Sequence, residues 1–342
     1  MRWLLSSMLS KPFTWLLHIA LTIILVGACV THFFGEQGEI HLRADQAKTI
    51  NHKSEITLFL WDFQVVSDEH GNPVDYITDL RMLDRSRKPL IVDEGSIRMN
   101  KPLKYHGWRF CQSDYDSDQQ GVVLAYNYDP WGIGITYTGY ALLLVAMLAF
   151  FFQPHTRFRA LMKQQHKWLM IGLGVVVVVL AFIMTKVVTP KPPLQPVLQT
   201  PLLGIHVSVI MLAYTLFAII AINGIVGLCS RRHSARSYLY QLSIILLYPA
   251  LFCLTAGIFI GAVWANMSWG RYWGWDPKET WALITMLVYA VLLLWPLIKK
   301  PTTISHQHLE KMFHLFSVIA FLFVLFTYFG VSYLLGGLHS YT

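Results

Sequence analysis

The chain has 342 residues, of which 55% are hydrophobic and only 13% are charged. This composition is too apolar for an ordinary water-soluble domain. The formal net charge is +8, but residues 35–131 have a net charge of −5 and the remainder has a net charge of +13. Most of the positive charge lies in short connections between apolar segments, so it gives no reason to expect binding to nucleic acid.

Seven stretches without Asp, Glu, Lys or Arg are long enough to cross a bilayer about 30 Å thick. They predict transmembrane helices near residues 12–34, 132–152, 168–185, 202–228, 239–263, 281–298 and 312–335. The predicted fold class is an α-helical polytopic membrane protein with about seven transmembrane helices and a small β-rich extracytoplasmic domain between helices one and two.

The basic residues of the short connections indicate the orientation of the chain. One side carries twelve Lys and Arg residues, whereas the short segments of the other side carry only four, which are Lys186, Lys191, Arg271 and Lys278. Short cytoplasmic loops are enriched in Lys and Arg. The amino terminus is therefore predicted to be cytoplasmic, and the β domain and carboxyl terminus are predicted to lie outside.

Residues 35–131 form the one sizeable segment between predicted spans. "EITLFLWDFQVV" and "GVVLAYNYD" alternate in the manner of strands, and "DEHGNP" and "MNKPLKYHGW" are typical of turns, so we predict an antiparallel β domain. "DYDSDQQG" is similar to a calcium loop, but Gln119 and Ala125 stand where that loop needs glycine and glutamate. We therefore interpret it as a solvated turn.

The remaining boundaries follow from the spans. We expect a cytoplasmic amino terminus with the first span at 1–34, a second span and cytoplasmic loop at 132–167, and a membrane domain at 168–342 with a tryptophan-rich segment at 264–281. The segment "KVVTPKPPLQPVLQTP" has five prolines in sixteen residues, which predicts an extended outer loop. The four cysteines have no Cys-x-x-Cys spacing, so neither a thiolate zinc site nor a redox-active dithiol is expected.

Histidines near the ends of the spans are candidate metal ligands. His206 and His339 lie near the outer surface, and His18 and His314 lie about one helical turn in from the inner surface. Neutral imidazole is a good ligand for iron. A single histidine at such a place is more often a hydrogen-bonded interface residue, but two at matching depth beside an aromatic segment favour a shared iron.

That aromatic segment is "WGRYWGWDPKETW", residues 269–281. An interfacial aromatic belt explains one or two tryptophans, but not four close together, which are Trp269, Trp273, Trp275 and Trp281. A flat apolar surface between two histidines suits a porphyrin, and Arg271 or Lys278 would pair with a propionate. Asp276 has two alternative roles, as a helix cap together with Glu279 or as a catalytic group.

With "LLGIHVSVIMLAYTLF" and "GVSYLLGGLHSY", the segment resembles the tryptophan-rich haem-handling family of cytochrome c biogenesis, in its CcsA-type form of system II. The stretch "IRMNKPLKYHGWRFCQSDYDSDQQGVVLAYNYDPWGIGITYTGY" resembles the ResB type, the other half of that system, so the chain resembles a compact fusion of both.

The resemblance implies a holocytochrome c synthase, or cytochrome c haem lyase, in the bacterial inner membrane, with its β domain on the periplasmic side. It implies that haem b is held by His206 and His339 over the tryptophan-rich segment and joined through its vinyl groups to the Cys-x-x-Cys-His thiols of an apocytochrome c. A thioredoxin-like thiol reductant is the further partner that it implies, besides the lipid bilayer.

One departure from the family concerns the inner leaflet. Leu294 stands where the family commonly has a histidine eighteen residues after the motif aspartate. We therefore expect His18 and His314 to provide an inner iron site instead.

Two alternative functions remain open. One is a haem exporter or chaperone that forms no bond, and the other is a di-haem b-type electron carrier that uses His18 and His32, which are about 21 Å apart at the helical rise.

Overall fold

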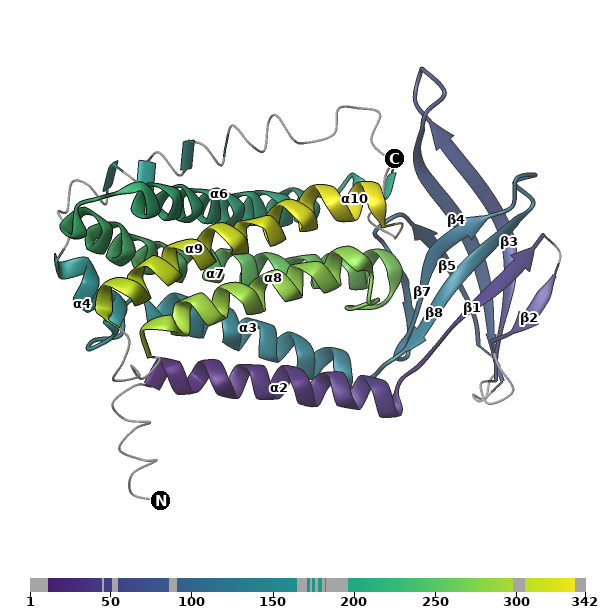
Figure 1. The fold of residues 1–342 in the computed structure, drawn as a ribbon. Helices are drawn as coiled ribbons and strands as arrows, with labels where there is room; N and C mark the ends of the chain where they lie inside the picture. Colours follow the sequence, from purple (N-terminus) through teal and green to yellow (C-terminus); the bar gives the residue numbers. More distant parts are fainter. Residues whose placement is uncertain are drawn as a thin grey trace. The chain divides into compact units, whose positions relative to one another are not determined.

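A computed structural model describes residues 12–44, 46–50, 55–85, 91–164, 196–297 and 305–335, and a few positions between 171 and 182 (Figure 1). Within these residues, six helices are long and apolar enough to cross a membrane. Together with a small antiparallel β domain between the first two of them, they confirm the predicted fold class: the protein is an integral membrane protein. The third predicted span, 168–185, falls largely outside the described residues.

The helices of the described chain are α2 (Pro12–Phe34), α3 (Gly132–Phe150), α4 (Arg157–Gln164), α6 (Pro201–Cys229), α7 (His233–Trp269), α8 (Pro277–Leu294), α9 (His306–Leu325) and α10 (Val331–Leu334). Short 3-10 turns lie at η1 (Pro196–Leu198) and η2 (Trp295–Leu297), and a π-helical turn η3 (Phe326–Gly330) joins α9 to α10.

Several helices extend beyond the uncharged stretches that predicted them. The fifth predicted span, 239–263, corresponds to α7, which begins at His233 and continues through Trp269. The sixth begins at Pro277 instead of residue 281 because Asp276 caps it. The seventh begins at His306 instead of residue 312 because Ser305 accepts a hydrogen bond from the His308 backbone N–H. Polar caps and charged ends continue a helix past its apolar part.

The described strands are β1 (Glu36–Arg43), β2 (Ala47–Thr49), β3 (Ile56–Ser67), β4 (Pro73–Asp84), β5 (Ile91–Arg98), β6 (Leu103–Tyr105), β7 (Trp108–Tyr115) and β8 (Gly121–Tyr128). They form two antiparallel four-stranded sheets, in the orders β1-β8-β7-β6 and β2-β3-β4-β5. The predicted strands in "EITLFLWDFQVV" and "GVVLAYNYD" are β3 and β8. The stretch "MNKPLKYHGW" contains strand β6 between two turns, because Lys104 and Tyr105 pair with β7.

The facing sides of the two sheets form the core of the β domain. Alternate residues of β1 and β4 point inward, and the buried side chains of the core include Leu42, Leu58, Leu80, Phe110 and Leu124. A buried hydrogen bond from Thr78 Oγ1 to Gln112 Oε1 (2.6 Å) joins β4 of one sheet to β7 of the other. Alternation of apolar and polar residues therefore determines the sandwich, as period-two patterning requires.

The β7–β8 turn holds the acidic stretch that is similar to a calcium loop. Asp116 accepts hydrogen bonds from Arg43 (2.8 Å) and His41 (3.0 Å), and Asp118 pairs with the same arginine. The pKa of Asp118 is lowered because the Gln120 backbone N–H and the Arg43 guanidinium both bind its charged form. These carboxylates are therefore engaged with the neighbouring strand β1.

The described chain folds as two compact units. The first comprises Met1–Ala146, Pro190–Leu203 and Gly261–Tyr272, and the second comprises Met147–Thr189, Gly204–Ile260 and Trp273–Thr342. In the first unit, α2 and α3 run side by side (Figure 1), and Gly27 leaves room for Thr136, because a Cβ there would stand 2.3 Å from the threonine hydroxyl. Buried Asp129 joins these helices by accepting hydrogen bonds from Thr31 (2.6 Å) and the Gly132 N–H (2.7 Å).

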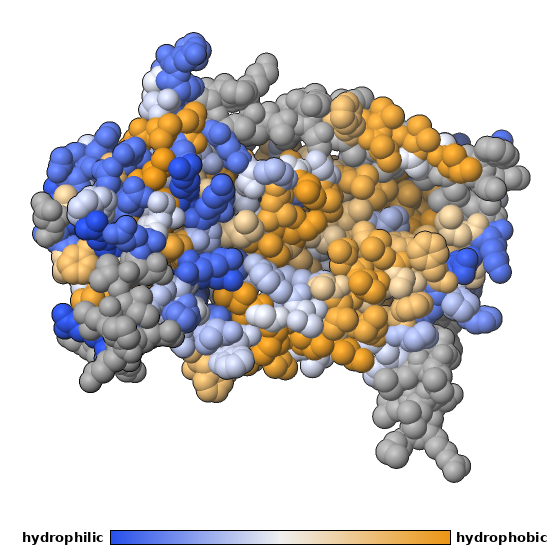
Figure 2. Space-filling view, turned by 180° about the vertical axis from the view of Figure 1, so that it is seen from behind, coloured by the Kyte–Doolittle hydropathy of each residue, from blue (hydrophilic) through white to orange (hydrophobic). Residues whose placement is uncertain are grey.

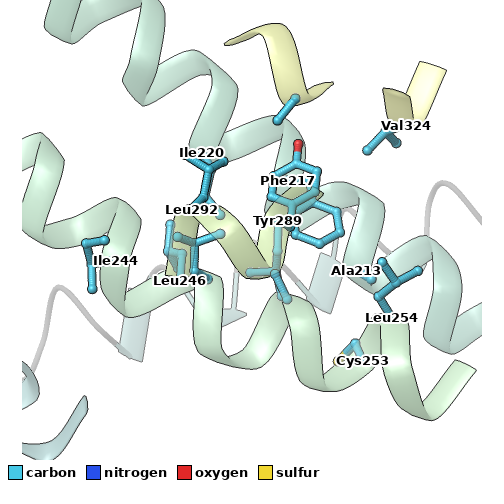
Figure 3. Close-up of a cluster of buried hydrophobic side chains, with 14 of the residues drawn as sticks. Ala213, Phe217, Ile220, Ile244, Leu246, Cys253, Leu254, Tyr289, Leu292 and Val324 are labelled. Atoms are coloured by element: carbon cyan, nitrogen blue, oxygen red, sulfur yellow. The ribbon is translucent and has the colours of Figure 1, made fainter. Parts of the chain in front are cut away.

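The second unit contains the main helical core. Phe217 of α6 stacks on Tyr289 of α8 with ring centroids 3.7 Å apart, and the same cluster includes Leu246 and Leu254 of α7 and Val324 of α9 (Figure 3). Many large apolar side chains of the helices point outward instead, and Figure 2 shows them as orange areas on the surface. Outward apolar side chains are what a helix in contact with lipid requires.

Candidate functional site

The tryptophan-rich segment begins inside a helix. Trp264 is buried and packs edge-to-face on Trp269, with ring centroids 4.8 Å apart, and both belong to α7. The helix ends there because Gly270 has a left-handed φ of 73°, a conformation common for glycine after a helix. The first part of the predicted tryptophan-rich segment at 264–281 therefore belongs to α7, which ends at Trp269.

Trp273 and Trp275 lie in the irregular stretch that follows. Their rings meet edge-to-face with centroids 5.9 Å apart. Trp275 is 73% exposed, and its φ is 54°. A bulky residue at positive φ costs roughly 1–2 kcal/mol, and such strain is concentrated at functional sites. Apart from this edge-to-face contact with Trp273, most of the Trp275 indole is exposed, and exposure on strained backbone favours a role in binding.

Trp281 has a different environment. It lies in α8, and its ring packs on Phe326 in the π-helical turn η3, with centroids 4.3 Å apart. The hydroxyl of Thr327 lies 3.3 Å from the Trp281 carbonyl and 2.9 Å from the Thr285 hydroxyl. The structure therefore brings Trp273 and Trp275 together in the second unit, places Trp281 between α8 and α9, and places Trp269 in the first unit.

The two predicted propionate partners also differ. Arg271 is exposed, in the stretch directly after Gly270. Lys278 is half-buried in the first turn of α8, and its Nζ donates to the Ser332 hydroxyl of α10 at 3.0 Å. Lys278 therefore connects the beginning of α8 to the end of the seventh predicted span, from which the chain continues toward His339.

Asp276 is the N-cap of α8. Its side chain accepts a hydrogen bond from the Lys278 N–H (2.9 Å), and Glu279 in return accepts from the backbone N–H groups of Asp276 (3.3 Å) and Gly274 (2.8 Å). This is the capping box predicted from Asp-Pro-x-Glu. The capping box gives Asp276 a structural role, and a catalytic role of Asp276 stays a prediction.

The two roles of Asp276 can be separated by substitution. Asp276→Ala should lower the free energy of unfolding by about 1 kcal/mol because it removes the cap. Asp276→Asn should keep the cap, because asparagine is an equally good N-cap residue, while it removes the charge. Thermal unfolding in detergent and haem retention should be measured for both. Wild-type haem handling in Asp276→Asn supports the cap alone, and its loss in a stable protein supports a direct role.

His206 lies in α6, half-buried, with its Nδ1 2.8 Å from the Gly257 carbonyl of α7. A carbonyl can only accept, so Nδ1 carries the proton and Nε2 carries the lone pair. This is the tautomer that a metal-ligating histidine needs, with the other ring nitrogen held by a carbonyl. His339, its predicted partner, lies outside the described residues.

The Gly257 carbonyl was not predictable as a partner of His206. Gly257 permits close approach of α6, because a Cβ there would stand 2.5 Å from Ile210. The only signal in the sequence is a glycine within an apolar span, and that signal does not identify the helix that it faces.

The two inner histidines have unlike surroundings. His18 is exposed on α2, and its Nδ1 donates to the Thr14 carbonyl at 2.7 Å, which leaves the lone pair on Nε2. His314 is fully buried in α9, and its Nε2 donates to the Arg236 carbonyl at 3.2 Å, which leaves the lone pair on Nδ1. They belong to different units, so their joint iron site stays a prediction.

The ring of His314 is closely packed. A Cβ at Gly227 of α6 would stand 2.7 Å from the imidazole Nε2. Nδ1 is buried, and the described residues give it no hydrogen-bond partner. Ligation of iron through Nδ1 would therefore require α9 to move from its neighbours.

The chain resembles known proteins over most of its length. Residues 135–339, more than half of the chain, match the cytochrome c assembly protein family, and residues 8–129 match the ResB-like family. These matches cover the membrane domain with the tryptophan-rich segment and the β domain, respectively.

Individual relatives agree with these matches. Protein NrfI of Wolinella succinogenes is 40% identical over 43% of this chain and 17% of that protein. The cytochrome c biogenesis proteins CcsA of Chlamydomonas reinhardtii and Guillardia theta are 37% and 35% identical, over 47% and 44% of this chain and 46% and 56% of those proteins. The matched part thus spans about half of the CcsA proteins and a smaller share of NrfI. Because the family match extends over residues 135–339 and includes the motif at 269–281, this chain belongs to the cytochrome c assembly protein family.

Proposed function

We propose that this chain is a holocytochrome c synthase that takes haem b as a substrate and promotes its attachment to apocytochrome c. The observation that carries the proposal is the hydrogen bond of the His206 Nδ1 to the Gly257 carbonyl, in the same compact unit as the exposed, strained Trp275. The His206 tautomer suits iron ligation, and the exposed indole suits the face of a porphyrin.

The reaction requires positioning more than acid–base chemistry. Each thiol of a Cys-x-x-Cys-His segment adds across one vinyl group of haem, so that a C–S bond forms and the thiol proton moves to the terminal vinyl carbon. No leaving group or oxidant is needed, provided that the thiols are reduced. A thioredoxin-like reductant is the partner that would keep them so. Holding the vinyl groups at the thiols contributes most of such catalysis.

The residues of this chain have separate tasks in the proposal. His206 and His339 hold the iron until the histidine of the apocytochrome replaces one of them. Trp273 and Trp275 cover the macrocycle, and Arg271 or Lys278 pairs with a propionate. The β domain presents the apocytochrome or its reductant.

Purified protein, haem and a reduced Cys-x-x-Cys-His peptide provide the direct test. We expect the peptide to acquire covalently bound haem that resists acid–acetone extraction, with the absorption spectrum of a c-type cytochrome. Haem that is bound and released without attachment would support an exporter instead. Stable reversible haem reduction without transfer would support an electron carrier.

We further propose that the protein lies in the bacterial inner membrane with its β domain and carboxyl terminus in the periplasm. The distribution of Lys and Arg supports this orientation. A reporter fused after residue 342 should be active outside, and one inserted at residues 231–236 should be active inside. The reverse pattern contradicts the orientation.

The inner site gives a separate prediction. If His18 and His314 admit haem before it reaches the outer histidines, His18→Ala should deplete haem at both sites. His18 is exposed, so this variant should fold normally, and it is more informative than His314→Ala, which leaves a cavity in the core. Resonance Raman and absorption spectra measure the haem. If a protein with both His18→Ala and His314→Ala still carries a full amount of haem at the outer histidines, the proposed entry site is wrong.

A further inference from the structure

Asn100 of the β domain contacts two segments of the membrane domain within the first compact unit. It lies in the tight turn between β5 and β6, which Arg98 and Lys101 close with hydrogen bonds of 3.2 and 3.0 Å between their backbones. The φ of Asn100 is 61°, a conformation that asparagine adopts more readily than most residues. A closed turn of this kind holds the Asn100 side chain in one place.

Both ends of the Asn100 amide are used. Nδ2 donates to the Val197 carbonyl at 3.1 Å, and Oδ1 accepts from the Ser268 hydroxyl at 2.6 Å. Because the Val197 carbonyl can only accept, the orientation of the amide is fixed by its partners. Val197 precedes α6, the helix that contains His206, and Ser268 precedes Trp269. One side chain therefore joins the two segments that lead to the candidate site.

Asn127 of β8 makes a second contact. Its Nδ2 donates to the Gly270 carbonyl at 3.0 Å. The backbone of Gly270 lies close to β7, since a Cβ there would stand 3.3 Å from the Cys111 sulfur. Asn266, one turn earlier in α7, donates to the Tyr137 hydroxyl of α3 at 3.0 Å. The end of α7 is thus bound on both sides by groups of the first unit.

These bonds matter because the chain after Trp269 is irregular. Residues 270–276 belong to no helix or strand, so their position depends on partners outside the segment. Gly270 is the first residue of that segment, so its backbone conformation determines the direction in which the chain leaves α7.

We propose that Asn100 and Asn127 are positioning residues, through which the ResB-like domain sets the geometry of the tryptophan-rich segment for haem. The proposal rests on the proposed function, to which it adds a structural task for the β domain. Neither amide touches haem. Their loss should leave the protein folded and able to bind haem, with the segment no longer held in the productive position.

The contact itself is tested without haem. Gly270→Cys places a thiol beside Cys111, and a mild copper–phenanthroline oxidant should join them in a disulfide, detected as a cross-linked peptide by mass spectrometry. Burial raises the pKa of the Cys111 thiol to about 11, so the reaction should be run at mildly alkaline pH to increase the thiolate fraction. Gly71→Cys is the matched control, because Gly71 has a similar φ of 81° and nothing within 4 Å. A Gly270→Cys protein that stays uncross-linked contradicts the contact.

The positioning role is tested by removing the amides. Asn100→Gly keeps the backbone conformation and removes only the side chain, and Asn127→Ala does the same in a strand. We expect about tenfold less holocytochrome for each, since small displacements of a reacting group have large effects. The midpoint potential or the absorption maximum of the bound haem should shift. Asn72→Ala, in the β3–β4 turn, should change neither, because among the residues that the structure describes Asn72 forms its hydrogen bonds with Asp68.

A double-mutant cycle provides the decisive outcome. Asn100→Gly and Ser268→Ala should be non-additive, because they remove the same hydrogen bond, whereas Asn72→Ala and Ser268→Ala should add. Additive effects of the first pair, or unchanged haem spectra and yields in both asparagine variants, overturn the inference. If the wild-type protein forms no holocytochrome, the proposed function is wrong, and the cross-link still tests the contact alone.

Discussion

Replacing His206 with alanine should remove an axial ligand of the haem iron and lower haem retention by at least about tenfold, since loss of an outer-shell partner alone costs ten- to a hundredfold in metal affinity. Holocytochrome formation should fall in parallel. His339→Ala should have a similar effect. Added imidazole should restore part of both, because it fills the vacated coordination position with the same chemical group. Haem content per purified protein and the absorption spectrum measure the result.

The control for this experiment is His308→Ala. His308 is exposed in the first turn of α9 and has no proposed role in haem binding. It should behave as wild type, with and without imidazole. Full haem content and activity in both His206→Ala and His339→Ala would show that these residues are not the ligands. Rescue by imidazole distinguishes a lost ligand from a misfolded protein, because imidazole does not repair packing.

Replacing Trp275 should weaken haem binding without weakening the fold. Trp275→Gly removes an exposed indole and also relieves the positive φ of 54°. The relief of strain and the greater freedom of glycine in the unfolded chain act in opposite directions, so stability should stay within about 1 kcal/mol of wild type. The lost aromatic surface should weaken haem binding by about ten- to a hundredfold.

Trp264→Ala provides the contrast. Trp264 is buried in α7, so its truncation should cost about 3–5 kcal/mol of stability, as large-to-small changes in a core do. Haem titration and thermal unfolding should be measured on the same preparations. A Trp275→Gly protein that binds haem as wild type but unfolds at lower temperature would assign this tryptophan a structural role.

Short-range sequence patterns were sufficient to predict most of the helices, two strands and one helix cap of this protein. Uncharged apolar stretches located six helices to within six residues of their observed ends, and the first was predicted from Pro12 to Phe34 as observed. Alternating residues located β3 and β8, and Asp-Pro-x-Glu located the capping box of α8. Each of these features depends on residues close together in the chain, so their spacing alone specifies them.

Only the tertiary structure shows which residues far apart in the sequence form hydrogen bonds with each other. The carbonyl that fixes the His206 tautomer belongs to Gly257, and the amide that reaches Ser268 belongs to Asn100, in the other family-matched half of the chain. The sequence places His18 and His314 at the same depth, yet the lone pair is on Nε2 in His18 and on the buried Nδ1 in His314. Hydrogen bonds between helices and strands depend on which backbone groups face each other after packing. Residue type and spacing do not encode that, so only the folded chain shows it.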